Sequence, residues 1–247
     1  MLKKRLIIVL TLVNGSLYGT RNFRPDHLYS YDFVDTWDID EIILLNIGKK
    51  DNDDLIFLNT LKDFSNKCFV PITVGGKINN LQKAEQIFKN GADKISINTA
   101  LKDKKLVEDF VRNFGSSSIV GSVDLKKKND KDFIFSHNDE NFISSKPIDY
   151  IKNIEDLGVG EILIQSVERD GTLLGFDIDL LNSITKDLNI PFIASSGGGN
   201  WKQFLNCFKK TLVSGLATTN IHHFTNKSIR SAKSFLLENN VDVRPPS

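Results

Sequence analysis

In two stretches of the chain, a short apolar run is followed by small, hydrogen-bonding residues of the kind that bind phosphate. One begins at Pro71 (Pro-Ile-Thr-Val-Gly-Gly-Lys), and the other begins at Pro191 (Pro-Phe-Ile-Ala-Ser-Ser-Gly-Gly-Gly). Backbone amides that no side chain shields can approach a phosphate closely, especially where a helix begins. The sequence therefore predicts two phosphate sites, formed by Gly76, Asn98 and Thr99 and by Gly171, Gly197, Thr218 and Thr219.

Charged and polar residues adjoin both predicted sites. Lys77 directly follows the first glycine pair. It either neutralises a bound phosphate or fills the site itself. Asp170 and Ser196 adjoin the second site and are included with it as substrate-binding candidates. Two anion-binding sites on opposite sides of one opening would suit a substrate that carries a phosphate at each end.

The two stretches belong to an internal repeat. Pro71 and Pro191, Thr99 and Thr219, and Glu41 and Glu161 are each 120 positions apart. A constant offset over three separated motifs indicates a duplicated architecture. We place the two halves at roughly residues 1–117 and 118–247.

Composition limits the class of protein. The chain has 247 residues, 40% of them hydrophobic, and a net charge of +1. This balance favours neither nucleic-acid nor membrane binding. Its two cysteines and four scattered histidines have no metal-ligand spacing, so we predict no metal site and no cofactor. The apolar run near the N-terminus is short and lacks a clean cleavage site, so we interpret it as a strand and expect a cytoplasmic protein.

Apolar runs alternate with amphipathic stretches along the whole sequence. Eight expected strands, each followed by a helical pattern, argue for a single domain (residues 1–247) with an α/β fold, the (β/α)8 or TIM barrel, built from two repeated half-barrels. We expect a polar loop after the first strand, a short helical face at 31–37 and a turn at 221–224. A helix is expected at 54–64 with Leu55, Leu58 and Leu61 inward. Lys126–Lys128 are expected to form a solvated hairpin arm with Phe133–Phe135.

Charged residues open several strands. Arg5, Glu41, Lys94 and Glu161 each stand at the start of an expected strand. Residues two apart in a strand share a face, so these four side chains point either into the barrel or outward to solvent. If they point inward, they form a ring of two positive and two negative charges at the N-terminal mouth. Parity alone leaves both possibilities open.

The opposite strand ends carry the residues suited to chemistry, as in characterised barrels of this type. Thr11 and Asp124 end the expected first and fifth strands.

Over nearly its whole length the chain resembles the cyclase subunit of imidazole glycerol phosphate synthase from histidine biosynthesis. The motifs that carry the resemblance are Lys4-Arg5-Leu-Ile, Asp40-Glu41, Thr73-Val-Gly-Gly, Gly91-Ala-Asp-Lys-Ile-Ser-Ile-Asn-Thr-Ala100, Gly160-Glu161-Ile-Leu, Arg169-Asp-Gly-Thr172, Ile193-Ala-Ser195 and Asn240-Val-Asp-Val-Arg244.

The resemblance implies a glutaminase subunit docked on the N-terminal face of the barrel and ammonia passing through to the C-terminal face. It assigns Arg5, Glu41, Lys94 and Glu161 to an ammonia gate and Asp93 to contact with the glutaminase. The family's cyclisation uses two aspartates as general acid and base. Asp124 matches one of them, whereas Thr11 stands where the other is expected. Lys77 and Ser196 also replace glycines of the phosphate loops.

These departures leave three hypotheses about function. The first is a barrel that conducts ammonia from a glutaminase to a separate enzyme that amidates a sugar in surface-polysaccharide biosynthesis. The second is a true cyclase with an altered proton-transfer residue. The third, of a different class, is a non-catalytic scaffold that binds phosphorylated ligands. A threonine hydroxyl cannot exchange protons near neutral pH as a carboxylate does, which removes a contribution on the order of 10²–10⁴ in rate.

Overall fold

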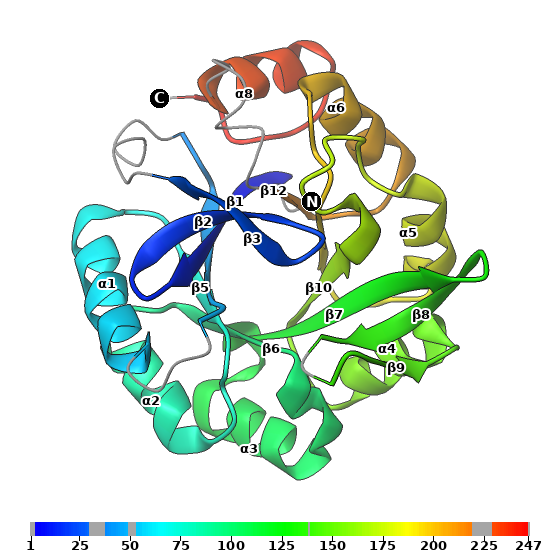
Figure 1. The fold of residues 1–247 in the computed structure, drawn as a ribbon. Coiled ribbons are helices and arrows are strands. Elements are labelled where there is room, and N and C mark those ends of the chain that lie inside the picture. Colours follow the sequence, from blue (N-terminus) through cyan, green and yellow to red (C-terminus); the bar gives the residue numbers. More distant parts are fainter. Residues whose placement is uncertain (1–2, 30–37, 49–52, 138, 219–228, 247) are drawn as a thin grey trace.

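Parallel strands close on themselves at the centre of the molecule. The computed structural model describes residues 3–29, 38–48, 53–137, 139–218 and 229–246. In these ranges eight strands pair in the order β10-β11-β12-β1-β4-β5-β6-β7, and β7 pairs again with β10 (Figure 1). The barrel strands are β1 (Arg5–Val13), β4 (Glu41–Asn46), β5 (Ile72–Gly75), β6 (Lys94–Ile97), β7 (Ile119–Lys128), β10 (Glu161–Ser166), β11 (Phe192–Ser195) and β12 (Gly215–Thr218). The predicted (β/α)8 barrel is confirmed.

Helices surround the barrel. They are α1 (Asp53–Lys67), α2 (Leu81–Lys89), α3 (Lys104–Phe114), α4 (Pro147–Asp156), α5 (Ile178–Thr185), α6 (Trp201–Lys210) and α8 (Ile229–Glu238). Each buries an apolar stripe against the strands, as Ala84 and Ile87 do in α2. The prediction for Leu55 was wrong, because this side chain is exposed in the first turn of α1. No helix in the described ranges is long and apolar enough to span a membrane.

The repeat is visible in the backbone. Asn80 and Asn200 cap α2 and α6 with nearly the same dihedral angles, φ −160° and ψ 164° against φ −161° and ψ 162°. In both cases the side-chain oxygen accepts a hydrogen bond from the amide three residues later. Gly76 and Ser196, also 120 positions apart, both have positive φ values of 103° and 94°. The two phosphate-type loops therefore share one backbone course.

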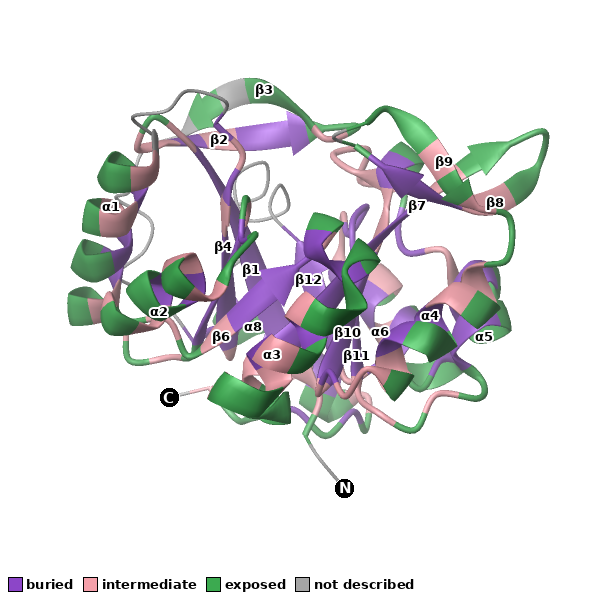
Figure 2. Ribbon diagram, turned by 90° about the horizontal axis from the view of Figure 1, so that it is seen from below, coloured by how far each residue is buried: buried purple, intermediate pink, exposed green. Residues whose placement is uncertain are grey.

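Two antiparallel additions lie over the C-terminal ends of the barrel strands (Figure 2). One is the hairpin of β2 (Ser16–Arg21) and β3 (Arg24–Tyr29), and the other joins β7 to β8 (Lys131–Ser136) and β9 (Asn141–Ser144). The predicted hairpin at Phe133–Phe135 is confirmed. The polar loop expected after the first strand is instead the β2–β3 hairpin. The elements expected at 31–37 and 221–224 lie outside the described residues.

The apolar core has two parts. The larger part packs the outer faces of the strands against the helices. A smaller cluster fills the inside of the barrel and consists of Ile7, Val9, Ile43, Val120, Leu163, Ile193 and Ala217. It separates the two ends of the barrel, where the polar residues predicted from the sequence lie.

Candidate functional site at the two ends of the barrel

The four strand-opening charges meet at the N-terminal end of the barrel. Arg5 donates to Glu41, with Nη1 and Oε2 2.7 Å apart, and also contacts Glu161. Lys94 Nζ lies 3.3 Å from Glu41 Oε1 and 3.0 Å from Glu161 Oε2. Each cation therefore bridges both carboxylates, and the four side chains form a closed ring. We call it the entry ring.

Strand register explains this convergence. Glu41 lies opposite Ile7 of β1, and Ile7 faces the interior, so Glu41 shares the interior face. Of the two orientations that parity left open, the structure has the inward one. The carboxylates of Glu41 and Glu161 are 2% and 8% exposed, whereas Arg5 and Lys94 are 24% and 20% exposed. The ring therefore presents its cations to solvent and holds its carboxylates behind them.

Electrostatics favour the ionised form of Glu161. Burial raises the pKa of Glu161, but the charges and hydrogen bonds of Arg5 and Lys94 outweigh burial and hold this pKa below its usual value. The Thr73 hydroxyl, 2.7 Å from Glu41 Oε1, supplies Glu41 with a further donor. Ser214 Oγ accepts from Arg5 at 3.1 Å. Every member of the ring is thus held in place by more than one partner.

Asp93 precedes Lys94 on the same face of the molecule and is exposed. Its carboxylate accepts a hydrogen bond from the backbone amide of Ile72, with Oδ2 and N 2.8 Å apart. Asp40 Oδ2 accepts from the Leu6 amide in the same way at 2.9 Å. Asp93 therefore fastens β5 to β6, in addition to presenting a charge on this face.

Asp124 lies at the opposite, C-terminal end of the barrel, which we call the mouth, and is buried. Gln165 Nε2 donates to its Oδ1 at 3.0 Å, and Asn98 Nδ2 donates to its Oδ2 at 3.2 Å. Burial raises the pKa of Asp124 to about 7, even though both of these hydrogen bonds lower it, and the charge of Asp170 raises it further. A carboxyl group that titrates near neutral pH is suited to accept and return protons.

Gln165 is a site residue that the sequence prediction missed. It faces the interior from β10, directly opposite Asp124 on β7. It also donates to Ser122 Oγ at 3.2 Å. Strand parity puts Gln165 on the same face as Glu161, four residues earlier, but only the register between β10 and β7 brings it against Asp124.

Thr11 does not face Asp124 with a free hydroxyl. Its Oγ1 donates to the backbone carbonyl of Tyr18, which is its partner residue in the β1–β2 pairing. The side chain is 4% exposed. At the position where the resemblance predicts a carboxylate, this chain therefore has a donor that holds the β2–β3 hairpin against β1.

The tip of that hairpin is fastened across the mouth to Asp170 and Gly171. The Phe23 amide donates to Asp170 Oδ2 at 2.9 Å, and the Asn22 amide donates to the Asp170 carbonyl at 3.2 Å. A Cβ atom on Gly171 would lie 2.4 Å from the Thr20 carbonyl oxygen, so only glycine allows this approach. Both residues were predicted to bind phosphate or substrate. In this structure Asp170 binds the tip of the hairpin and Gly171 lies close against it, and their role in binding stays a prediction.

The structure brings the residues of the first predicted phosphate site close to one another only in part. Gly76 and Asn98 follow neighbouring strand ends, since Gly75 lies opposite Ser96, and Thr99 begins the 3-10 turn after β6. The Asn98 side chain, however, points to Asp124. Lys77 has a positive φ of 55°, and its Nζ lies 3.9 Å from Asp54 Oδ1.

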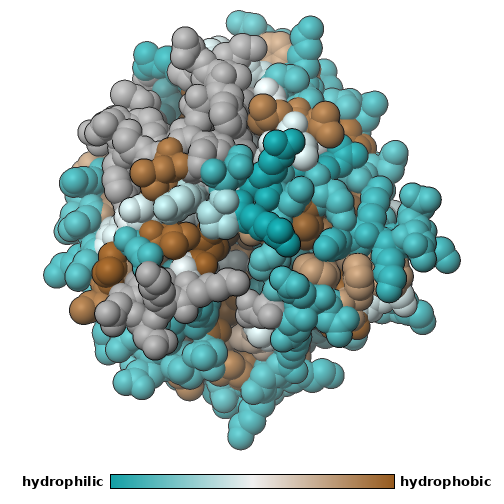
Figure 3. Space-filling model, viewed as in Figure 1, coloured by the Kyte–Doolittle hydropathy of each residue, from teal (hydrophilic) through white to brown (hydrophobic). Residues whose placement is uncertain are grey.

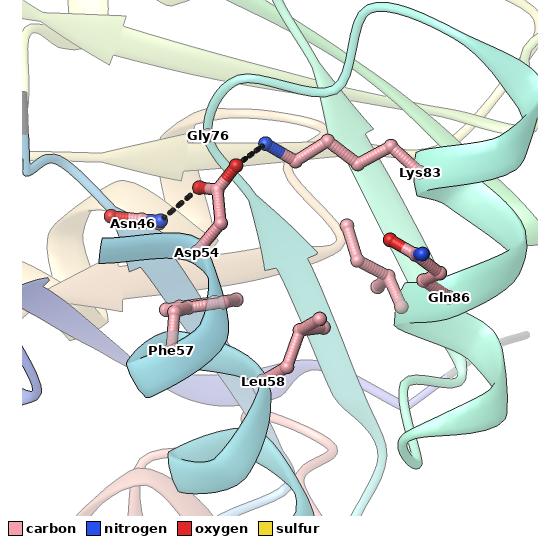
Figure 4. A pocket seen from close by; sticks show the side chains of 8 residues that line it. Asn46, Asp54, Phe57, Leu58, Gly76, Lys83 and Gln86 are labelled. Atoms are coloured by element: carbon pink, nitrogen blue, oxygen red, sulfur yellow. Dashed lines mark hydrogen bonds and ion pairs between the residues drawn. The ribbon is translucent and has the colours of Figure 1, made fainter. Parts of the chain in front are cut away.

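Asp54 organises a small cavity beside this loop, between α1 and α2. Lys83 donates to Asp54 Oδ2 at 2.6 Å, and Asn46 donates to Oδ1 at 3.2 Å (Figure 4). Phe57, Leu58 and Ile87 form the apolar wall of the cavity. Lys77 and Lys83 therefore share one carboxylate, which lowers the net positive charge available to an anion here.

The second predicted phosphate site is more compact. The Gly175 amide donates to the Gly197 carbonyl at 2.6 Å, which brings the loop after Gly171 against Ser196-Gly197. The Thr218 hydroxyl donates to the Gly198 carbonyl at 3.4 Å. Thr219 lies outside the described residues. On the described part of the face that Figure 3 shows, hydrophilic side chains predominate, with smaller apolar areas between them.

Comparison with known proteins agrees with this arrangement. Residues 9–227 match the family model described as "Histidine biosynthesis protein". The chain is 33% identical over 250 residues to the "Imidazole glycerol phosphate synthase subunit HisF" of Chlorobium limicola, covering 99% of this chain and 100% of that one. It is also 33% identical to the subunits of the same name from Staphylococcus carnosus and Clostridium botulinum, over 254 and 252 residues, again covering 99% of this chain and at least 99% of each relative.

A barrel with a closed charge ring at one end and a buried, neutral-range carboxyl group at the other thus matches these relatives along its whole length. The chain belongs to the histidine biosynthesis protein family and is a homologue of the HisF subunits of imidazole glycerol phosphate synthase.

Proposed function

We propose that this chain is the ammonia-using barrel subunit of a glutamine amidotransferase of the imidazole glycerol phosphate synthase kind. The observation that carries the proposal is the order of environments along the barrel axis. The closed entry ring is followed by the apolar interior cluster and then by Asp124 at the mouth. This order suits a neutral, polar, small molecule that must not become an ion on the way.

Ammonia has those properties, and ammonium does not. The outward-facing cations Arg5 and Lys94 repel ammonium before it reaches the ring. The apolar interior then disfavours any ion, since burying an unpaired charge costs far more than burying a neutral polar molecule. The two layers together favour passage of the neutral, nucleophilic form.

A glutaminase subunit docked on the N-terminal face supplies the ammonia under this proposal. The names of the relatives describe them as subunits, so a second component is part of their enzymes. On this chain Asp93 is exposed beside Lys94 of the ring and is available to a partner through its second carboxylate oxygen. The resulting complex has the ring within its interface.

Two candidates remain for the reaction at the mouth. The names of the relatives favour the first, the activity of an imidazole glycerol phosphate synthase. The resemblance implies that this activity is a cyclisation, and the two predicted phosphate sites suit a substrate with a phosphate at each end. Asp124, whose pKa is about 7, is suited to serve as its proton-transfer group, and the two repeat-related loops would hold the phosphates.

The Thr11 hydroxyl favours the second candidate, delivery of ammonia to a separate acceptor. This hydroxyl is bound to the Tyr18 carbonyl and cannot act as the second carboxylate of a cyclase. Ammonia would then leave the mouth unreacted for another enzyme, and a sugar in surface-polysaccharide biosynthesis is the acceptor we predict.

A cyclase assay with ammonium salt separates the two candidates, because added ammonium replaces the glutaminase. Turnover within tenfold of a relative that has both aspartates would establish the cyclase. Turnover lower by about 10² or more, the contribution of one general acid–base group, is the result expected for ammonia delivery. Substitution Asp124→Asn is the control, since it must abolish any residual turnover that belongs to this mouth.

A further inference from the structure

Two large apolar side chains are strongly exposed on the loops around the entry ring. Phe69 is 100% exposed and Leu212 is 72% exposed. Phe69 stands three residues before β5 begins, and Leu212 stands three residues before β12 begins. Because parallel strands all start at the same end of a barrel, both side chains belong to the N-terminal face.

This placement is peculiar to two strands. The residues three positions before the other described barrel strands, except β1, are Asp38, Gly91, Ser116, Gly158 and Asn189. None of them is apolar. Asn189 is the counterpart of Phe69 in the sequence repeat, so the two halves differ at this point of the face.

The two apolar side chains flank one side of the entry ring. The strand order around the barrel is β12-β1-β4-β5, so Leu212 and Phe69 border the two strands that supply Arg5 and Glu41. Each is linked to the ring through its own strand: Thr73 of β5 donates to Glu41, and Ser214, beside β12, accepts from Arg5. The opposite side of the face, from β6 to β11, carries Asp93, Ser116 and Asn189.

We propose that Phe69 and Leu212 are the two apolar anchors by which the glutaminase seats off-centre, on the β12–β5 side of the entry ring. This proposal rests on the proposed function and adds to it the position and chemistry of the partner. The partner surface would have two apolar recesses on either side of its ammonia outlet.

The requirements of ammonia transfer select this occupant. Ammonia that meets water at the ring is lost as ammonium, so the donor must exclude water around Arg5 and Glu41. Exposed aromatic and aliphatic side chains that become buried beside a charged centre are the usual way in which interfaces exclude water. Asp93, on the other side of the ring, is left for a charge-assisted contact at the rim, where such contacts contribute less to affinity.

The test is a titration of the purified barrel with the glutaminase subunit of its own complex, by calorimetry. Phe69→Ala and Leu212→Ala are each expected to raise Kd about tenfold or more, which is about 1.4 kcal/mol. Asn189→Ala, at the repeat-related position, and Leu55→Ala, an exposed leucine in the first turn of α1, are the matched controls and are expected to leave Kd within twofold.

Three results would overturn the proposal. If the double variant Phe69→Asp, Leu212→Asp binds the glutaminase as tightly as wild type does, the two side chains are not anchors, while the proposed function stands. Weakening by Asn189→Ala as large as that by Phe69→Ala would show a centred rather than an off-centre seat. Light scattering of the barrel alone that shows a dimer dissolved by the double aspartate variant, with glutaminase affinity unchanged, would assign the surface to a second copy of this chain. A wild-type barrel that binds no glutaminase would instead contradict the proposed function itself.

Discussion

The two ends of the barrel treat their carboxyl groups in opposite ways. At the entry ring, Glu41 and Glu161 are paired twice with Arg5 and Lys94, and the pKa of Glu161 is held below its usual value. At the mouth, Asp124 is equally buried, but its donors among the described residues are the neutral amides of Gln165 and Asn98, and its pKa rises to about 7. Burial is similar, so the partners decide the outcome.

The difference shows which end is fixed and which is reactive. A ring of paired charges with several partners each is a structural device that keeps one geometry. A single carboxyl group that changes its protonation state near neutral pH can take part in proton transfer. The chain has both devices. At the mouth, however, Thr11 holds a hairpin at the position where the resemblance of this chain to the family predicts a second carboxylate.

Breaking the entry ring should have the largest effect on stability. Glu41→Gln leaves Arg5 and Lys94 with one carboxylate between them in a site where Glu41 is 2% exposed. We expect the free energy of unfolding to fall by about 3–5 kcal/mol, as for other broken buried pairs. Urea denaturation at pH 7 measures this. Glu85→Gln, which breaks the exposed pair with Lys89, is the control and should change stability by at most about 0.5 kcal/mol.

Asp124 should make stability depend on pH in the direction opposite to Glu161. The ordinary pKa of an aspartate is 3.8, and that of folded Asp124 is about 7, so the folded state binds more protons than the unfolded state between these values. The free energy of unfolding therefore falls as the pH rises through this window, by up to about 4 kcal/mol. Asp124→Asn should remove this loss, which denaturation curves of both proteins at pH 5 and pH 8 measure.

Glu161→Gln provides the opposite comparison. The lowered pKa of Glu161 stabilises the fold above its ordinary value, and that contribution disappears as the pH falls through the folded pKa. Wild type should therefore lose stability relative to Glu161→Gln in acid and relative to Asp124→Asn towards neutral pH. The same sign of pH dependence for both variants would contradict the contrast between the two ends.

Thr11→Asp tests whether the mouth has been rebuilt around the hairpin. The new carboxylate would face the Tyr18 carbonyl without a proton to donate, so we expect a loss of about 1–3 kcal/mol in the free energy of unfolding. Thr11→Ser keeps the hydroxyl and should lose less. If Thr11→Asp is as stable as wild type and also raises cyclase turnover, the hairpin contact is incidental and the phosphate loops are still functional. Unchanged turnover would point to Lys77 and Ser196 as a second lesion.

The smallest effect is expected for a substitution of Asp93. Asp93→Asn keeps an oxygen that accepts from the Ile72 amide and removes only the charge. Stability should therefore stay within about 0.5 kcal/mol of wild type. Affinity for the glutaminase should fall severalfold at low salt, with the difference shrinking at high salt. Calorimetric titrations at two salt concentrations measure it, and a salt-independent loss would mean that the contact is not electrostatic.

Sequence patterns predicted most of the frame of this molecule. The eight barrel strands followed from alternating apolar and amphipathic runs, and the repeat offset of 120 positions reappears in the paired caps Asn80 and Asn200. The inward ring was one of two options, because parity fixes which residues share a face but not which face is inside.

The misses concern contacts between distant segments. The β2–β3 hairpin turns through Asn22 and Phe23, both with positive φ, and a phenylalanine in that conformation gives no turn signal. Gln165 meets Asp124 only through the register of β10 against β7. Leu55 follows the helical period but lies in the first turn of α1, where its side chain is exposed.

The central claim is that ammonia crosses the entry ring on its way to the mouth. In the complex with glutaminase, Arg5→Ala opens the ring and leaves Glu41 and Glu161 with Lys94 as their only charged partner in the ring. Glutamine hydrolysis should continue while product formed per glutamate falls severalfold, because ammonia escapes to solvent. Activity with added ammonium salt, which enters at the mouth, should stay near the wild-type value. The ratio of glutamate to product, measured in wild type, Arg5→Ala and Lys94→Ala, is the decisive quantity. A ratio unchanged in both variants would mean that ammonia does not pass the ring.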